Sequence, residues 1–374
     1  MKNKICFVSS SFPRWDPRIF LRQAKSLVLF GFNVTYIVCD GKQDENKEGV
    51  MVLNSEFFPK NRFQRFFSGK NLLYKKAISV NADIYQISEP ELISLGLKLK
   101  RLGKKVIFDM REDYPHLMLS KEYLPKFSRK CISFALSKYL NSSLQKFDLL
   151  ISVTPQLVNL LKRINPETIL VASFPIVREN SQITLEDYEN RENTLCYIGT
   201  VYRISRQEVL FRTLEEIKNI QYIIAGRMET DYYKSELQSL PYWGKVKFTD
   251  GISRDEILEL YEKVTIGNSL RDFSGTGYEE GSLGVLKIFE YMEASLPIIC
   301  SDVKLWKEIV DKYKCGIYVN PNNEEEIKNA IHYLIDNKKE AFEMGQNARK
   351  AITEEFNWGT QEVKYIKVIN SLLI

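Results

Sequence analysis

The sequence predicts an α/β protein of two Rossmann-like domains that face a cleft. The chain has 374 residues, which is too long for one ordinary domain and suggests two domains of similar size. Short apolar runs alternate with segments of helical spacing, and this alternation indicates parallel sheets with helices on both faces. The alternation breaks once, over the polar and non-periodic residues 175–192, and then restarts.

Six apolar runs in the first half are predicted to be strands: 4–9, 33–40, 83–88, 105–110, 148–154 and 168–174. Helical spacing lies between them, most clearly at 17–30, 90–102 and 121–145. The second half repeats the pattern, with predicted strands at 194–201, 221–226, 245–250, 264–270, 296–302 and 316–320. Helices fill its gaps, and two more follow up to residue 355.

Composition narrows the class of protein. Hydrophobic residues make up 44% and charged residues 27%, which is the balance of a soluble globular protein. No apolar run approaches the length of a membrane span, and the first apolar run is too short for a signal peptide. We therefore expect a cytoplasmic protein, with a peripheral position on the inner face of the membrane as the alternative.

Cysteine and histidine usage argues against a metal site. None of the six cysteines forms a CxxC pair, so buried free thiols in a reducing compartment explain them better than disulfides or zinc. His116 and His332 are the only histidines, which disfavours a His-based metal site or a Ser-His-Asp triad. One histidine could still act alone. We predict no metal and no cofactor.

Candidate site residues follow predicted strands, because ligands bind outside the carboxyl ends of the strands in open parallel sheets. Polar loops of this kind occur at 9–18, 111–116, 202–207 and 271–284. Asp16 followed by Pro is the pattern of a helix N-cap, which leaves Arg18 as the better ligand candidate of the first loop.

The stretch "LKIFEYMEASLPII" begins at Leu286, directly after the loop 271–284. Lys287 and Glu290 share a helix face there, since they are three residues apart. Free N–H groups at Gly284, Val285 and Leu286, where the helix begins, would attract a phosphate, and Lys287 adds a full charge. Glu290 could accept hydrogen bonds from a sugar diol, so the face fits a nucleotide. The alternative is a mobile loop followed by a solvated ion pair.

Other phosphate-binding motifs are missing. The first strand is not followed by G-x-G-x-x-G, and the P-loop pattern does not occur. Arg203 and Arg206 follow the first strand of the second half, where arginines can clamp a diphosphate. The alternative is that they are solvated residues at the start of a helix, but the clustering of two arginines favours the functional interpretation.

The segment "VLKIFEYMEASLPII" resembles the signature helix of the retaining glycosyltransferases of family four, which have the GT-B fold. The family pattern is close to P-x-K-x-x-E-Y-M-A-x-G-x-P-V-I. Most of the chain shares the likeness, in the family's order: "DPRIFLRQAKSLVLFGFNV", "FDMREDYP", "ISVTPQLVNLLK", "CYIGTV", "FTDGISRDEILELY" and "GQNARKAITEEFNW".

The resemblance implies roles at the matching positions. Glu290 would hold the ribose of a nucleotide-diphosphate sugar, the donor substrate. Lys287, with Arg206 or Arg203, would bind the diphosphate and stabilise the leaving group, which requires no metal. The family transfers the sugar with retention.

Three departures from the family pattern concern the donor sugar and the chemistry. The first glutamate of the family's pair falls at Ser282, and the interpretation that keeps the role has Glu279 or Glu280 reach the same space from a reshaped loop. The alternative is that the donor sugar is held differently. The histidine of the H-E motif is Arg111 here, and His116 lies five residues on. "SSSFP" replaces the glycine pair after the first strand.

We therefore predict a GT-B glycosyltransferase that moves a hexose-type sugar to a glycan or lipid-linked glycan in surface polysaccharide assembly. Residues 1–178 would form the acceptor domain, 179–192 a linker and 193–356 the donor domain, with a helix at 357–374 crossing back to the first domain. Two rivals remain: an epimerase-like enzyme of the same fold, and a catalytically silent nucleotide- or glycan-binding protein.

The distribution of charge predicts a third partner, besides the donor and the acceptor: an anionic membrane surface. Residues 1–192 hold 30 Lys and Arg against 20 Asp and Glu, a net of +10 that leaves −5 for the rest. Within this half, 57–76 and 121–146 combine basic with aromatic or apolar residues, which suits an anionic membrane surface. The alternative is an aromatic core with ordinary surface cations, and no motif indicates nucleic-acid binding.

Overall fold

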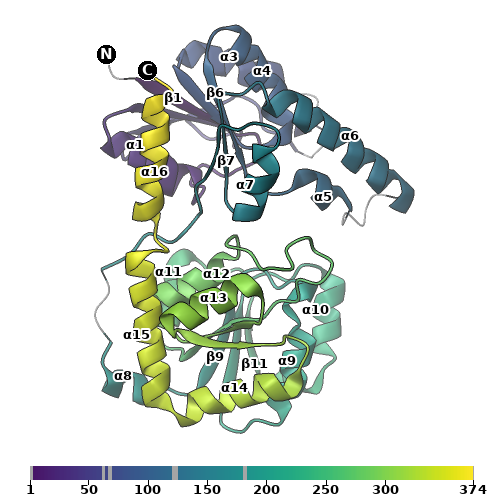
Figure 1. The fold of residues 1–374 in the computed structure, drawn as a ribbon, viewed down its shortest axis with the longest axis vertical. Helices are drawn as coiled ribbons and strands as arrows, with labels where there is room; N and C mark the ends of the chain where they lie inside the picture. Colours follow the sequence, from purple (N-terminus) through teal and green to yellow (C-terminus); the bar gives the residue numbers. More distant parts are fainter. Residues whose placement is uncertain (1–2, 61–63, 66–69, 120–124, 180–182, 374) are drawn as a thin grey trace. The chain divides into compact units, whose positions relative to one another are not determined.

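The computed structural model divides the chain into two compact units, each of them an α/β domain (Figure 1). Unit 1 comprises Met1–Ser173 and Trp358–Ile374, and unit 2 comprises Phe174–Asn357. The described residues are 3–60, 64–65, 70–119, 125–179 and 183–373.

Unit 1 contains an eight-stranded sheet in the order β3-β4-β2-β1-β5-β6-β7-β8. Its strands are β1 (Lys4–Val8), β2 (Asn33–Val38), β3 (Glu45–Lys47), β4 (Val50–Asn54), β5 (Ile84–Ile87), β6 (Lys105–Met110), β7 (Leu149–Ser152) and β8 (Thr168–Leu170). All neighbours pair in parallel except β3, which runs antiparallel to β4 at the edge.

The six strands predicted in this half are present. β6 has the predicted bounds and the other five are somewhat shorter, whereas β3 and β4 were missed. In β4 the burial alternates, because Val50 and Val52 are buried and Met51 between them is exposed, although the residues themselves form an apolar run. The three residues of β3 are all exposed and polar, so no hydrophobic pattern marks that strand. It exists because the edge of the sheet offers it backbone partners.

Helices cover both faces of this sheet. They are η1 (Ile19–Ala24, a π-helical turn), α1 (Lys25–Leu29), α3 (Lys70–Val80), η2 (Pro90–Leu92), α4 (Ile93–Arg101), α5 (Tyr114–Leu119), α6 (Lys126–Leu144), α7 (Pro155–Lys162) and α16 (Trp358–Ser371). α16 lies beside α1 in Figure 1. Its indole Trp358 donates a hydrogen bond to the Ser26 hydroxyl, and Ile366 and Ile369 join the core of unit 1.

A buried polar network ties α16 to the centre of the sheet. Arg18 donates two hydrogen bonds to Asp109 at the end of β6, with distances of 2.7 and 2.8 Å. Gln23 donates to the same carboxylate, Gln86 donates to Gln23, and the Tyr365 hydroxyl donates to Gln86. Burial alone would raise the pKa of Asp109, but the Arg18 charge and hydrogen bonds outweigh it and hold the pKa below its usual value.

This network changes the interpretation of the first loop. Arg18, expected as a ligand, is buried and committed to Asp109, so it is a structural residue. Asp16 does cap the following helix, because its carboxylate accepts the backbone N–H groups of Arg18 and Ile19. The same carboxylate accepts two hydrogen bonds from Arg111, whose guanidinium lies 3.7 Å from the centre of the Phe12 ring.

Unit 2 contains a six-stranded parallel sheet in the order β11-β10-β9-β12-β13-β14. Its strands are β9 (Thr194–Ile198), β10 (Gln221–Ala225), β11 (Val246–Thr249), β12 (Ile266–Ser269), β13 (Ile298–Ser301) and β14 (Gly316–Val319). All six correspond to predicted strands. The predicted fold class of two parallel-sheet α/β domains with a C-terminal helix is confirmed.

The helical elements of unit 2 fill the connections between strands and follow the last strand. They are α8 (Leu185–Glu189), η3 (Arg203–Ser205), α9 (Gln207–Glu215), α10 (Asp231–Gln238), η4 (Pro241–Lys245), α11 (Arg254–Tyr261), α12 (Leu286–Glu293), α13 (Lys304–Tyr313), α14 (Glu324–Asp336) and α15 (Lys338–Glu354).

The expected linker 179–192 is not all irregular. A capping box formed by Thr184 and Asp187 starts α8, and Tyr188 on this helix is buried in the core of unit 2. The helix has only one buried residue and five residues in all, which is too short for a periodic signal.

We predict that Asp109→Asn destabilises the protein by about 3–5 kcal/mol, because it leaves the Arg18 guanidinium buried without its counter-charge. The measurement is urea-induced unfolding of the whole chain. The folded pKa of Asp109 is depressed, so its contribution is present above about pH 4 and is lost as pH falls through the folded value. The difference between wild type and variant should therefore narrow on acidification.

Glu324→Gln is the matched control, since it removes a carboxylate from an exposed pair with Arg212. It should change stability by about 1 kcal/mol or less. Equal effects of the two substitutions would contradict a structural role for the buried pair.

Candidate active site

The connectivity of unit 2 creates one natural ligand position. From β9 the chain adds β10 and β11 on one side, and it then crosses to the other side of β9 to add β12, β13 and β14. The strand order therefore switches direction between β9 and β12. Ligands of open parallel sheets bind outside the carboxyl ends of the strands at such a switch point. The segments that leave β9 and β12 and the helix that follows therefore supply the candidate site.

α12 is fixed against these two strands by one tyrosine. The backbone N–H of Ile198 in β9 donates a 2.9 Å hydrogen bond to the Tyr291 hydroxyl. Gly267 in β12 makes room for the ring, because a Cβ there would lie 2.5 Å from it. The Tyr291 ring also meets Tyr261 edge-on, with 5.9 Å between the ring centroids. α12 can therefore hold Lys287 and Glu290 in fixed positions.

Lys287 lies on the first turn of α12 beside the end of β9. Its ammonium is 3.1 Å from the centroid of the Tyr197 ring, which is a cation–π contact. Burial lowers its pKa well below the usual lysine range, and the charge of Arg271 lowers it further. The salt bridges among described residues include neither of these two cations. An anion bound here would relieve their mutual repulsion.

Arg271 was missed by the sequence analysis. It follows β12 directly, within the loop 271–284 whose strand-end position was recognised, but it lacks a second basic residue nearby in the sequence. Its backbone N–H donates to Ser301 at the end of β13, which holds the loop. Its guanidinium lies 5.3 Å from the centre of the Tyr202 ring. Tertiary folding alone brings its charge close to Lys287.

Glu290 is one turn beyond Lys287 and is largely shielded, with 24% of its side chain exposed. Arg254 donates a 2.7 Å hydrogen bond to one carboxylate oxygen, and the Tyr261 hydroxyl donates a 3.3 Å bond to the other. Burial raises the pKa of Tyr261, so this phenol stays protonated as a donor. The i,i+3 ion pair with Lys287 that was kept as an alternative is not formed, because Glu290 pairs with Arg254 in α11.

Arg206 and Arg203 separate in the structure. Arg206 adopts a left-handed backbone conformation (φ 51°, ψ 41°) at the start of α9. It donates a 2.6 Å hydrogen bond to Asn322, lies 3.1 Å from Glu208 and lies 4.0 Å from Asp272 in the loop after β12. Arg203 instead forms an exposed pair with Glu236 of α10, with distances of 2.9 and 2.6 Å.

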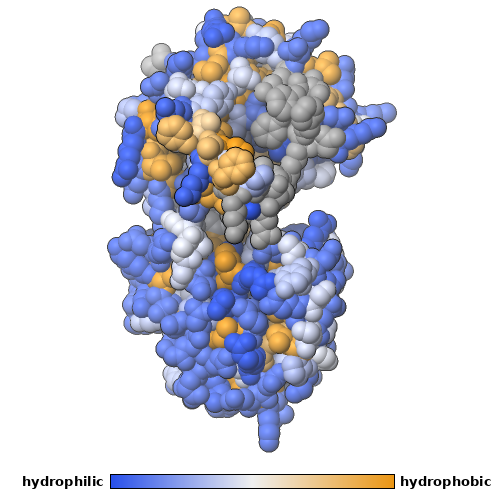
Figure 2. Space-filling view, turned by 90° about the vertical axis from the view of Figure 1, so that its right-hand side faces the viewer, coloured by the Kyte–Doolittle hydropathy of each residue, from blue (hydrophilic) through white to orange (hydrophobic). Residues whose placement is uncertain are grey.

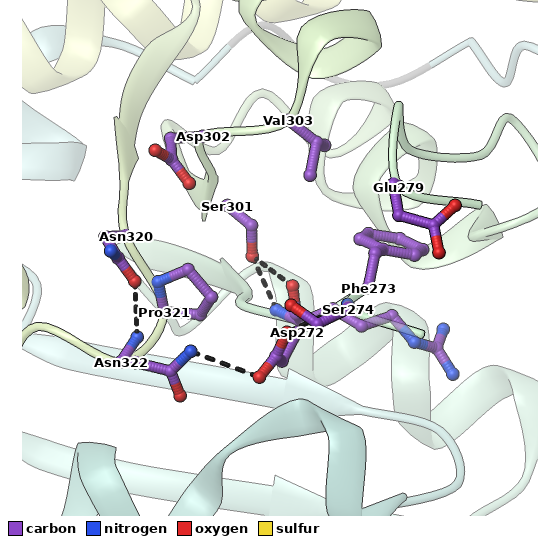
Figure 3. A pocket seen from close by; sticks show the side chains of 11 residues that line it. Asp272, Phe273, Ser274, Glu279, Ser301, Asp302, Val303, Asn320, Pro321 and Asn322 are labelled. Carbon is purple, nitrogen blue, oxygen red and sulfur yellow. Dashed lines mark hydrogen bonds between the residues drawn. The ribbon is translucent and has the colours of Figure 1, made fainter. Parts of the chain in front are cut away.

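A polar cavity of about 230 Å³ opens at the carboxyl ends of β12, β13 and β14 (Figure 3). Asp272 and Asn322 point toward one another there and are joined by a hydrogen bond of 3.1 Å. Burial alone would raise the pKa of Asp272, but hydrogen bonds from Ser274 and Asn322 and the charge of Arg206 lower it. The lining also includes Arg271, so the cavity adjoins the cations described above.

The predicted loop glutamates point to different surroundings. Glu279 lines the cavity, and its carboxylate accepts the Gly277 N–H at 3.1 Å. Glu280 is exposed and lies 3.6 Å from Lys304. Ser282, at the position of the family's first glutamate, is buried, and its hydroxyl accepts the Gly284 N–H at 3.0 Å.

The helix start falls where it was predicted. Val285 is the N-cap of α12 and Leu286 its first residue, and no side chain caps the first turn. Val285 and Leu286 thus bring uncapped N–H groups next to the loop that carries Arg271, an arrangement that favours an anion. The Gly284 N–H, which was expected to contribute as well, is already donated to Ser282.

Arg111 and His116 belong to unit 1 rather than to this group. Arg111 is held by Asp16, as described above. His116 lies on α5, and its backbone N–H donates to the Asp113 carboxylate, which caps that helix. His116 also lines a second cavity, between α5, α6 and α7.

The described residues contain no group of three or more His, Cys, Asp or Glu side chains placed to hold a metal ion. No described helix combines the length and the apolar character that crossing a bilayer requires. The six cysteines are free, and Cys131 on α6 is exposed rather than buried as expected.

Comparison with known proteins supports the same chemistry. Residues 182–351 match the family model described as glycosyl transferases group 1. An uncharacterized glycosyltransferase of Methanocaldococcus jannaschii is 21% identical over 286 residues, which cover 73% of this chain and 70% of that protein.

Two solved structures share the fold over nearly the whole chain. Sucrose-phosphate synthase from Thermosynechococcus elongatus has a TM-score of 0.73 at 15% identity, covering 100% of this chain and 99% of the other. The Anabaena protein HepE, in complex with UDP and glucose, has a TM-score of 0.68 at 14% identity, covering 99% and 100%. Two parallel-sheet units with these likenesses define a GT-B glycosyltransferase. The protein is therefore an enzyme of class EC 2.4.

We predict that Lys287→Met leaves the melting temperature equal or higher but lowers turnover by about 10²-fold or more. Burial disfavours the ammonium in the ligand-free fold, so its loss should cost no stability. The folded pKa is lowered, so the unfolded chain binds this proton more readily. Wild-type stability relative to the variant should thus rise with pH from the folded pKa up to the ordinary value of about 10.4.

Thermal unfolding at a series of pH values measures the effect on stability. Sugar-transfer assays measure the effect on turnover. Lys350→Met, on the exposed surface of α15, is the control and should change neither. A variant of Lys287 that unfolds at lower temperature yet turns over normally would overturn the assignment.

Proposed function

We propose that the enzyme transfers a sugar with retention from a nucleotide-diphosphate sugar to a glycan or lipid-linked glycan acceptor, in surface polysaccharide biosynthesis. The observation that carries the donor half is a pair of cations at the switch point of unit 2, Lys287 and Arg271, neither of which forms a salt bridge with a described carboxylate. The UDP and glucose bound by HepE support a nucleotide-sugar donor.

The two phosphates of the donor would lie between the start of α12 and the loop after β12. The bond that breaks joins the anomeric carbon to a phosphate oxygen, and negative charge develops on that oxygen. Fixed cations and N–H groups aimed at the departing oxygen lower the barrier without reorganisation. Lys287 and Arg271 would supply the charge. Arg206 could join them by exchanging its hydrogen bond to Asn322 and its 3.1 Å ion pair with Glu208 for the diphosphate.

Glu290 would bind the ribose hydroxyls. Arg254 and Tyr261 already orient its carboxylate, and each carboxylate oxygen has lone pairs left for further donors. Pre-oriented acceptors lose less conformational freedom on binding, which favours this role over a plain surface ion pair.

The test is donor binding by Glu290→Ala. Loss of a charge-assisted hydrogen bond costs about 1.5–3 kcal/mol, so the affinity for the nucleotide should fall by about tenfold or more. A thermal-shift panel of nucleoside diphosphates and their sugar conjugates first identifies the ligand. Titration calorimetry then compares wild type, Glu290→Ala and the exposed control Glu354→Ala. Unchanged affinity in folded Glu290→Ala would refute the ribose role.

Product analysis separates the rival functions. Transfer to an acceptor with the anomeric configuration of the donor supports a retaining transferase. Conversion of the donor to an isomer without acceptor would support an epimerase-like enzyme, and binding without any conversion would support a silent binding protein.

The main support for a membrane surface comes from α6. In the segment 57–76, Phe58 is 61% exposed but Leu73 is buried in the core. α6 has no Asp or Glu, and Phe127 and Phe134 are 81% and 62% exposed. Lys138 lies 4.6 Å from the centre of the Phe134 ring. In Figure 2, hydrophobic and hydrophilic side chains are interspersed over the visible face of unit 1, whereas unit 2 is largely hydrophilic. Phe63, Phe66 and Phe67 of the other basic segment lie outside the described residues.

Co-sedimentation with vesicles tests the surface. We expect binding to vesicles with anionic lipid at low salt, weaker binding at high salt, and about 1 kcal/mol lost for each of Lys130→Gln and Lys138→Gln. Lys350→Gln in unit 2 is the control. Equal recovery in the supernatant with and without vesicles at low salt would exclude membrane association.

A further inference from the structure

A second cavity, in unit 1, is not used by the donor chemistry. It has a volume of about 350 Å³ and lies between α5, α6 and α7. This volume is at the lower end of the roughly 300–1,000 Å³ of small-ligand pockets. All its lining residues belong to the described part of unit 1.

The deep side of this cavity is apolar. Met110, Leu140, Leu144 and Leu161 all line it, and each is at most 2% exposed. Such a surface offers a ligand no hydrogen bonds and favours hydrocarbon over water by roughly 25 cal/mol per Å² buried. A nucleotide, or a sugar with its many hydroxyls, would leave its polar groups unsatisfied against these side chains.

The mouth of the cavity is polar. Asn141 and Arg163 line it and are exposed, and His116 lines it and is half-buried. Arg163 forms no salt bridge with any described carboxylate. Asp113 also lines the cavity, but its carboxylate accepts the His116 backbone N–H and caps α5. Arg163 is the cation at the mouth that a ligand phosphate can meet, and Asp113 is the one carboxylate among the residues that line this cavity.

α6 extends the positive surface away from the mouth. Ser133, Ser137 and Asn141 of α6 line the cavity. Phe134 and Lys138 each follow one of these residues in the sequence, so the helical period places them on the adjacent face of α6. The exposed stripe of cations and aromatic rings described above therefore runs along one border of the cavity. Because α6 contains no acidic residue, this border favours an anionic ligand.

We propose that this cavity binds the hydrocarbon chain of an anionic lipid in which a phosphate is attached to an apolar chain. The chain would occupy the leucine-lined interior, and the phosphate would meet Arg163 at the mouth. The identification of this lipid as the acceptor's anchor rests on the proposed function, whereas the binding of a lipid phosphate does not.

Titration calorimetry with dodecyl phosphate, kept below its micelle concentration, tests the proposal on the full chain. Inorganic phosphate tests the phosphate without the chain, and non-ionic dodecyl maltoside tests the chain without the phosphate; these two compounds are called the half-ligands. We expect one dodecyl phosphate per chain, bound at least about tenfold more tightly than either half-ligand. Equal affinity for dodecyl maltoside, or no binding of dodecyl phosphate, would overturn the proposal.

Two matched pairs of variants locate the site. Leu160→Trp adds bulk at the lining of the cavity, whereas Leu102→Trp adds the same bulk at an exposed position outside it. Arg163→Glu reverses the charge at the mouth, and Arg101→Glu reverses an exposed charge on α4. We expect affinity for dodecyl phosphate to fall about tenfold or more in Leu160→Trp and Arg163→Glu, and to stay unchanged in both controls. An equal loss of affinity for dodecyl phosphate in the variants and the controls would show that the lipid does not bind in this cavity.

Nucleotide binding, measured on the same preparations, separates this inference from the proposed function. Dodecyl phosphate binding without any nucleotide binding would support the cavity and refute the donor site. Nucleotide binding without dodecyl phosphate binding would refute the cavity alone.

Discussion

The docking of α12 on the unit 2 sheet is the contact on which the candidate site depends. Tyr291 accepts a hydrogen bond from β9, and its ring fills the space that Gly267 leaves in β12. A larger residue in place of Gly267 would push the helix outward, because packed interiors have no room for an extra carbon. Lys287 and Glu290 would then move away from the carboxyl ends of the strands together.

The two units differ in whether their shielded cations are paired with carboxylates. In unit 1, Arg18 and Arg111 each face a buried carboxylate that accepts two hydrogen bonds, so their charges are neutralised within the fold. In unit 2, Lys287 and Arg271 lie near one another without a salt bridge to a described carboxylate, and burial opposes the charge of Lys287. Such an arrangement costs stability in the empty protein and is relieved by a bound anion. A group perturbed both by burial and by a specific neighbouring charge is a candidate for a functional site.

Stability and function are also divided along the chain. The C-terminal helix α16 contributes Tyr365 to the polar network of unit 1, and Asp109 organises that network. The network is fully hydrogen-bonded and holds no group free for chemistry. By contrast, the loop 271–284 and α12 place their polar groups at a cavity or at the uncapped start of a helix.

The sequence alone determined the alternation of strands and helices, because a strand buried on both faces needs a continuous apolar run whatever its neighbours are. It also determined where α12 begins and that Lys287 and Glu290 share its face, since the helical period is a local property. The edge strand β3 and the short helix α8 could not be predicted, because their few residues carry no apolar period.

Only the tertiary structure decided which charges are free. Arg18 and Arg203 resemble ligand residues in the sequence, but Asp109 and Glu236, distant along the chain, neutralise them. Arg271 lacks a recognisable motif and becomes a candidate site residue only because folding brings it near Lys287. Long-range packing sets which cation pairs with which carboxylate. Local sequence patterns cannot predict these pairs, because the partners are far apart along the chain.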